Sequence, residues 1–169
     1  MRQIAVPVFF LCMTLVLPTG CKSQKEVNNP QTQGSPGMAV TFAAACGEDR
    51  TVWLTSTLSN TGPARIELPS GGLPWNYDGT GASLEVSTSS RAIARREVFP
   101  EFQPVGPDVL APGETRNGTL PFEFLYPGIR EHLGKEDVLV DWTYSTQSGG
   151  HSGVQVSGRL VVKEDPCRR

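Results

Sequence analysis

The sequence predicts an all-β protein, folded as a single antiparallel β-sandwich of about seven to eight strands with one short helical turn. Apolar and polar residues alternate in several short runs, which is the period of a half-buried strand. The 18 glycines and 14 prolines of the chain separate many of these runs, as turns do. The stretch 37–169 has the size of one domain with one core, so we expect one sandwich rather than two.

Each expected strand is a run in which every second residue is apolar. In 51–59, for example, Val52, Leu54 and Leu58 share one face, and in 138–144 Val140 and Trp142 share another. Trp142 is therefore expected in the core, where sandwiches often place a tryptophan. The expected strands are 38–45, 51–59, 64–68, 83–87, 119–124, 138–144 and 154–162.

The connections carry turn chemistry. Pro112 and Gly113 occupy the central positions that a type II turn requires. The stretch 145–153 is rich in serine and glycine and is expected to join the last two strands as a hairpin. The stretch 126–133 is the expected helical turn, and Pro127 is acceptable near its start.

The N-terminus has the layout of an export signal. Arg2 is basic, the run 4–17 is apolar, and 18–20 lead to Cys21. This pattern resembles the signal of bacterial lipoproteins, which implies that residues 1–20 are removed and that the Cys21 thiol carries a diacylglycerol. Ordinary secretion is the alternative. An uncleaved anchor is disfavoured because a spanning helix needs about 20 apolar residues.

The resemblance implies a location in the bacterial cell envelope, with the lipid as membrane anchor. Lys22 after the cysteine is similar to proteins sorted to the outer membrane, facing the periplasm. The polar stretch 21–36 is then the lipidated cysteine and a flexible tether. Without residues 1–20 the chain has 14 Lys and Arg against 17 Asp and Glu, a net charge of −3. Nucleic acid is therefore not an expected partner.

Two cysteines remain after Cys12 and Cys21 are set aside. In an oxidising compartment Cys46 and Cys167 are expected to form a disulfide between the first strand and the C-terminus. Two separate thiols are the alternative.

The turns give a second resemblance. The segment 58–62, the later Pro-Gly-Glu turn at 112–114 and the closing valine-rich hairpin are similar to bacterial immunoglobulin-like accessory domains. They also resemble proteinase-inhibitor-type sandwiches. The resemblance implies an immunoglobulin-like sandwich; because it rests on turns, it transfers no activity.

The long connection 69–81 is the strongest candidate for a ligand or partner site. It places Trp75 and Tyr77 beside Asn76 and Asp78, and aromatic faces next to amide and carboxylate groups stack on sugars or hold a partner loop. The structural alternative is that Leu73 and Trp75 fold back and plug the open end of the sandwich.

Two further features remain open. Trp53 has the parity of the polar residues in its strand, so it is either exposed as a contact surface or covered by its neighbours. Arg91, Arg95 and Arg96 form a basic cluster that either docks an anionic partner or protects an edge strand from aggregation.

No pattern for catalysis or a cofactor is found. His132 and His151 are far apart in sequence and are expected at the surface, so no metal site is predicted. No Gly-x-Ser-x-Gly elbow is present, and the chain is not expected to be an enzyme. The first hypothesis is a lipid-anchored protein-interaction module, an accessory subunit of an envelope complex. The alternatives are a carbohydrate or cell-wall binder and a peptidase-inhibitor-like sandwich.

Overall fold

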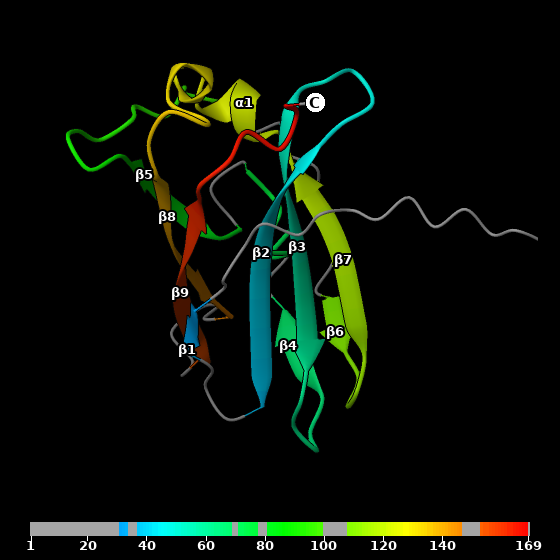
Figure 1. Ribbon diagram of the computed structural model, residues 1–169. Helices are drawn as coiled ribbons and strands as arrows, with labels where there is room; N and C mark the ends of the chain where they lie inside the picture. Colours follow the sequence, from blue (N-terminus) through cyan, green and yellow to red (C-terminus); the bar gives the residue numbers. More distant parts are fainter. Residues whose placement is uncertain are drawn as a thin grey trace, which may run out of the picture.

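The computed structural model describes residues 31–33, 37–68, 71–77, 81–99, 108–146 and 153–168. Antiparallel strands dominate it, with two short helical turns at one end (Figure 1). The elements are β1 (Gln31–Gln33), β2 (Met38–Cys46), β3 (Val52–Asn60), β4 (Ile66–Leu68), β5 (Ser83–Ser87), β6 (Asp108–Leu110), β7 (Thr115–Leu120), α1 (Phe122–Leu125), η1 (Ile129–Glu131), β8 (Val138–Ser145) and β9 (Gln155–Val162).

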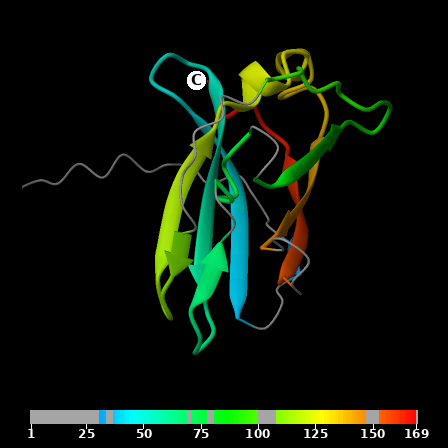
Figure 2. The ribbon, with the colours of Figure 1, turned by 180° about the vertical axis from the view of Figure 1, so that it is seen from behind.

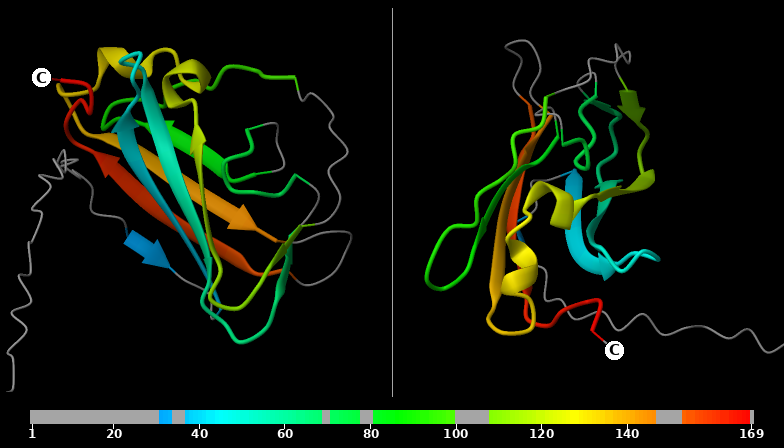
Figure 3. Two further views of the ribbon diagram at one scale, coloured as in Figure 1. Left: turned by 90° about the vertical axis from the view of Figure 1, so that its right-hand side faces the viewer. Right: turned by 90° about the horizontal axis from the view of Figure 1, so that it is seen from above.

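Two sheets form the two layers of the sandwich. One has the strand order β1-β9-β8-β5 and the other the order β2-β3-β7, while β4 and β6 make a small third pair. Viewed from above, the layers lie face to face, and from behind β4 and β6 lie near the lower end of β7 (Figures 2 and 3). The prediction of an all-β antiparallel sandwich is confirmed.

The core lies between the two sheets and follows the alternation of the sequence. In β3 every second side chain from Val52 to Asn60 is buried, and β8 buries Val138, Val140, Trp142 and Tyr144 in the same way. The Trp142 ring is 3% exposed and lies 5.4 Å from that of Phe42 on the opposite sheet. Trp142 is therefore a core residue, as predicted.

β7 differs from the prediction at both ends. The alternation in 119–124 predicted a strand there, but β7 already begins at Thr115 and stops at Leu120, and α1 begins at Phe122. Pro121 has no N–H to donate to a ladder. Its carbonyl accepts from Leu125 N–H at 3.0 Å instead, which starts a helical turn that buries Phe122 and Leu125. The predicted turn at 126–133 is present only as η1.

Two short strands lie outside the predicted runs. β6 pairs with β4, and β1 pairs with β9 inside the stretch expected to be tether. The exposed edge of β9 offers backbone groups to any extended segment, so a polar sequence such as Gln-Thr-Gln is able to pair there. The other residues of 21–36, including Cys21, lie outside the described residues.

The described part of the chain contains no helix long and apolar enough to cross a membrane.

Candidate binding groove

A groove of about 560 Å³ opens at the end of the β2-β3-β7 sheet where α1 lies. Its volume is in the range of small-molecule sites. Its apolar lining residues are three aromatic residues, a proline and a valine. The lining residues are Asp49, Thr51, Val52, Trp53, Tyr77, Thr119, Pro121, Glu123 and Phe124.

The first wall is the loop between β2 and β3, and hydrogen bonds within this loop set the position of Trp53. The Trp53 indole N–H donates to the Thr51 hydroxyl at 2.7 Å, and that hydroxyl donates to Asp49 Oδ1 at 2.6 Å. Gly47 lies directly against the indole: a Cβ at this position would be 2.7 Å from Trp53 Nε1. The loop therefore needs glycine at 47 to hold the ring in place.

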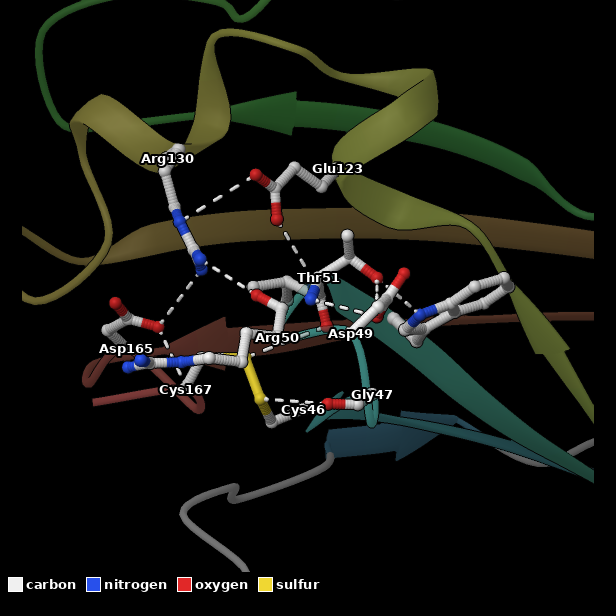
Figure 4. The surroundings of a disulfide bond; sticks show 11 residues. Cys46, Gly47, Asp49, Arg50, Thr51, Glu123, Arg130, Asp165 and Cys167 are labelled. Carbon is white, nitrogen blue, oxygen red and sulfur yellow. Dashed lines mark hydrogen bonds and ion pairs between the residues drawn. A yellow bond between two sulfur atoms is a disulfide. The ribbon is translucent and has the colours of Figure 1, made fainter. Parts of the chain in front are cut away.

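The same loop is fastened to α1 and to the C-terminal segment (Figure 4). Because β7 ends before it reaches Val52, the Val52 N–H donates to Glu123 Oε2 of α1 at 3.0 Å. Arg130 donates to the Arg50 carbonyl at 2.8 Å and lies within ion-pair distance of Glu123 and Asp165. Arg130 thus joins three separate segments behind the groove.

A disulfide between Cys46 and Cys167 holds the base of this loop, with the Cα atoms 5.0 Å apart. The predicted pairing is confirmed. Cys167 N–H donates to Asp165 Oδ1 at 2.9 Å, so the disulfide and the Arg130 contacts act on the same C-terminal turn. We expect this arrangement to keep Asp49, Thr51 and Trp53 fixed relative to α1.

Tyr77 and Phe124 also line the groove, and they are 40% and 48% exposed. Arg95 donates to the Tyr77 carbonyl at 2.5 Å. The Arg96 guanidinium lies 4.5 Å above the centre of the Phe124 ring, in a cation–π contact. Two arginines of the basic cluster, Arg95 and Arg96, therefore contact groove residues, and neither of them lines the groove.

The structure describes three of the four residues proposed from the 69–81 loop, and it separates them. Tyr77 joins Trp53 at the groove, whereas Trp75 points inward and packs against the core beneath Gly118 of β7. The Asn76 side chain donates to the Gly71 carbonyl and holds the loop. Asp78 lies outside the described residues. For Trp75 and Leu73, which both pack against the core, the structure supports the plugging interpretation.

Both charged residues in the groove lining are acidic. Hydrogen bonds from the Thr51 hydroxyl and amide hold the pKa of Asp49 below its ordinary value, so it is a carboxylate at neutral pH. Glu123 already accepts from the Val52 amide and faces Arg130. The groove thus combines aromatic faces with hydrogen-bond acceptors and a negative charge.

His132 differs from the prediction of a surface residue, since it is only 9% exposed. Its Nδ1 lies 2.7 Å from Glu136 Oε1, and its Nε2 lies 2.8 Å from the Arg91 guanidinium. Because a guanidinium only donates, Nε2 is the acceptor and Nδ1 carries the proton. The histidine therefore joins two loops. His151 lies outside the described residues, among which no three His, Cys, Asp or Glu side chains form a metal site.

Five groove residues were not expected from the sequence, namely Phe124, Thr119, Pro121, Asp49 and Glu123. The available signal was Pro121, which cannot continue a strand and so places the residues after it on a different element.

Comparison with known proteins gave no match: no family model, no curated protein and no solved structure is significantly similar to this chain.

Proposed function

We propose that this chain is a non-catalytic binding module of the bacterial cell envelope, and that the groove beside Trp53 holds a neutral glycan. The observation that carries the proposal is the convergence of Trp53, Tyr77 and Phe124 on a groove that also contains two carboxylates. Trp53 and Tyr77 come from a strand and a distant loop, and both were candidates on sequence grounds alone.

The composition of the groove suits a sugar. The C–H face of a sugar ring is apolar and packs on an aromatic face, while its hydroxyls donate to carboxylates. Hydrogen bonds to charged acceptors contribute about 1.5–3 kcal/mol each. Asp49 and Glu123 supply such acceptors, and Thr119 also lines the groove. The Asp49 carboxylate, which forms no ion pair among the described residues, also repels anionic ligands, and this favours a glycan without acidic groups.

A protein partner is the second candidate, and one observation favours it. Trp and Tyr are the residues most often found at the energetic centres of protein interfaces. A protein segment with an apolar side chain next to a lysine or arginine would match the aromatic, acidic groove. This candidate is the protein-interaction module expected from the sequence, with the groove in place of the 69–81 loop as its contact site.

The envelope location and the lipid on Cys21 are part of the proposal and rest on the N-terminal signal. Mass spectrometry of the protein purified from membranes is expected to show a diacylglycerol on Cys21. The Cys21→Ala variant is expected to lose the lipid and the membrane association. An unmodified Cys21 in membrane-purified protein would contradict the anchor.

Calorimetric titration with neutral oligosaccharides tests the glycan. We expect Trp53→Ala and Tyr77→Ala each to weaken binding at least tenfold, which corresponds to about 1.4 kcal/mol. Phe99→Ala is the matched control, because Phe99 is 86% exposed and does not line the groove. Circular dichroism and urea denaturation check that each variant is folded. Equal loss in all three variants, or in none, would contradict the proposal.

Photo-crosslinking in cells separates the two candidates. A photoreactive phenylalanine analogue at position 77 is compared with the same analogue at position 99. A discrete protein adduct from position 77 alone would favour the protein partner. Glycan-modified peptides from position 77, without a protein adduct, would favour the glycan.

A further inference from the structure

The outward face of the β2-β3-β7 sheet continues from the groove and differs from the rest of the surface. Trp53, Thr55, Thr57 and Ser59 alternate with the buried residues of β3, so they point away from the core. Their registered neighbours on β7 are exposed, and those on β2 are half-buried. The face consists of Ala39, Thr41, Ala43, Ala45, Trp53, Thr55, Thr57, Ser59, Thr115, Asn117 and Thr119.

None of these eleven residues is charged, and seven carry a hydroxyl or a side-chain amide. The outward face of the other sheet provides an internal comparison. There Glu85, Asp141 and Arg159 lie in one row across β5, β8 and β9, and Asp141 and Arg159 form an ion pair at 2.6 Å. The absence of charge is therefore a property of one described face and not of both.

The polar groups of the uncharged face are ordered in rows. The first row, next to the groove, holds Thr55 and Thr119, and Thr119 is also part of the groove lining. The second row holds Thr57 and Asn117, and the third holds Ser59 and Thr115. Rows lie about 6.8 Å apart along a strand, and neighbouring strands about 4.8 Å apart. The three rows therefore cover about 14 Å of the sheet beyond Trp53, enough for several groups of an extended ligand.

Internal hydrogen bonds orient these side chains. The Thr57 hydroxyl donates to Asn117 Oδ1 at 2.7 Å, which directs the amide nitrogen of Asn117 away from Thr57. The Ser59 and Thr115 hydroxyls are 2.9 Å apart, so one of them donates to the other and the second keeps its own proton for a ligand. Each pair keeps both a donor and an acceptor for a ligand, and its orientation is fixed before binding, which lowers the entropic cost of association.

We infer that this face is a second part of the glycan site, on which a neutral, acetamido-bearing polysaccharide extends from the groove across the rows of Thr, Ser and Asn. The inference rests on the proposed function. It is carried by the continuity of the face with the groove through Thr119 and by its lack of charge. A ligand with alternating donors and acceptors and no charge is the chemical complement of such a face. A charged polymer would lose its hydration there without gaining a counter-charge.

Calorimetry with β-1,4-linked N-acetylglucosamine oligomers of two and five units tests the inference. For the unmodified protein we expect the pentamer to bind at least tenfold more tightly than the dimer. The double variant Thr57→Val/Asn117→Val removes the second row without introducing charge. It is expected to lose most of this gain while its affinity for the dimer stays within twofold.

Thr143→Val on the other sheet is the matched control and is expected to keep the gain. Equal affinity of the unmodified protein for both oligomers would overturn the inference while leaving the groove in place. Unchanged binding of both oligomers in Trp53→Ala would overturn the proposed function itself. An oligogalacturonate of five units that binds as tightly as the neutral pentamer would also overturn the inference, because an uncharged face offers a polyanion no counter-charge.

Discussion

Replacing Cys46 and Cys167 together by alanine removes the covalent bond between the β2–β3 loop and the C-terminal turn. The two cysteines are 121 residues apart in sequence. In the chain-entropy model, closing a loop of this length lowers the entropy of the unfolded chain by about 16 cal/mol/K, which stabilises the fold by about 5 kcal/mol at 25 °C. Domains of this size have total stabilities of about 5–15 kcal/mol. The bond therefore accounts for a large share of the stability.

Urea denaturation followed by tryptophan fluorescence measures this effect. We expect the double variant to lose about 4–5 kcal/mol and to show a steeper dependence on urea, since an unfolded chain without the crosslink exposes more surface. The unmodified protein in a reducing agent is the matched control and is expected to behave like the variant. A loss below about 1 kcal/mol in both samples would refute the argument that the long loop makes this bond stabilising.

Three further predictions concern other parts of the fold. Gly118→Ala is expected to destabilise the protein by about 1–3 kcal/mol, because a Cβ at position 118 would lie 2.1 Å from the Trp75 ring. An unchanged urea midpoint would show that Trp75 does not pack there. Asn60→Ala is expected to lower the free energy of unfolding by about 3 kcal/mol in the same assay, because the buried amide donates to the Ala64 and Leu110 carbonyls at 2.7 and 3.0 Å. A loss under about 0.5 kcal/mol would contradict that role. The pKa values of Asp49 and Glu136 are lowered by hydrogen bonds from Thr51 and His132, so the folded state binds fewer protons than the unfolded state. Stability is therefore expected to fall as the pH drops through and below the ordinary values of 3.8 and 4.5, and the fall is expected to be smaller in Asp49→Asn; thermal unfolding between pH 6 and 2 checks this.

The sandwich follows from the sequence because alternation controls which side chains are buried. The strands β2, β3, β5, β8 and β9 lie within about one residue of the predicted runs at either end. The alternation of apolar and polar residues predicted the wrong element at 119–124. Leu120, Phe122 and Phe124 have the period of a strand, but Pro121 ends the hydrogen-bonded ladder. Period alone does not separate a short strand from a strand followed by a helical turn.

The groove was only partly predictable. Trp53 and Tyr77 were candidates as separate residues, but their meeting depends on the tertiary fold. Trp75 and Tyr77 are only two residues apart, yet one packs under Gly118 and the other lines the groove. The path of an irregular loop is set by such contacts and not by a local period. The sequence therefore left open whether Trp75 binds a ligand or plugs the sandwich, and whether Trp53 is exposed or covered.

The proposed function depends most on the groove beside Trp53 as the ligand site, and the indole N–H signals of the protein test this directly. The chain has three tryptophans, of which Trp142 and Trp75 pack in or against the core and Trp53 lines the groove. A two-dimensional ¹H–¹⁵N spectrum, with each signal assigned by a Trp→Phe variant, is recorded during titration with the N-acetylglucosamine pentamer. The Trp53 signal is expected to shift in a saturable way, while the signals of Trp75 and Trp142 are expected to stay in place. A stationary Trp53 signal at saturating pentamer, or a larger shift of Trp75, would contradict the proposed function.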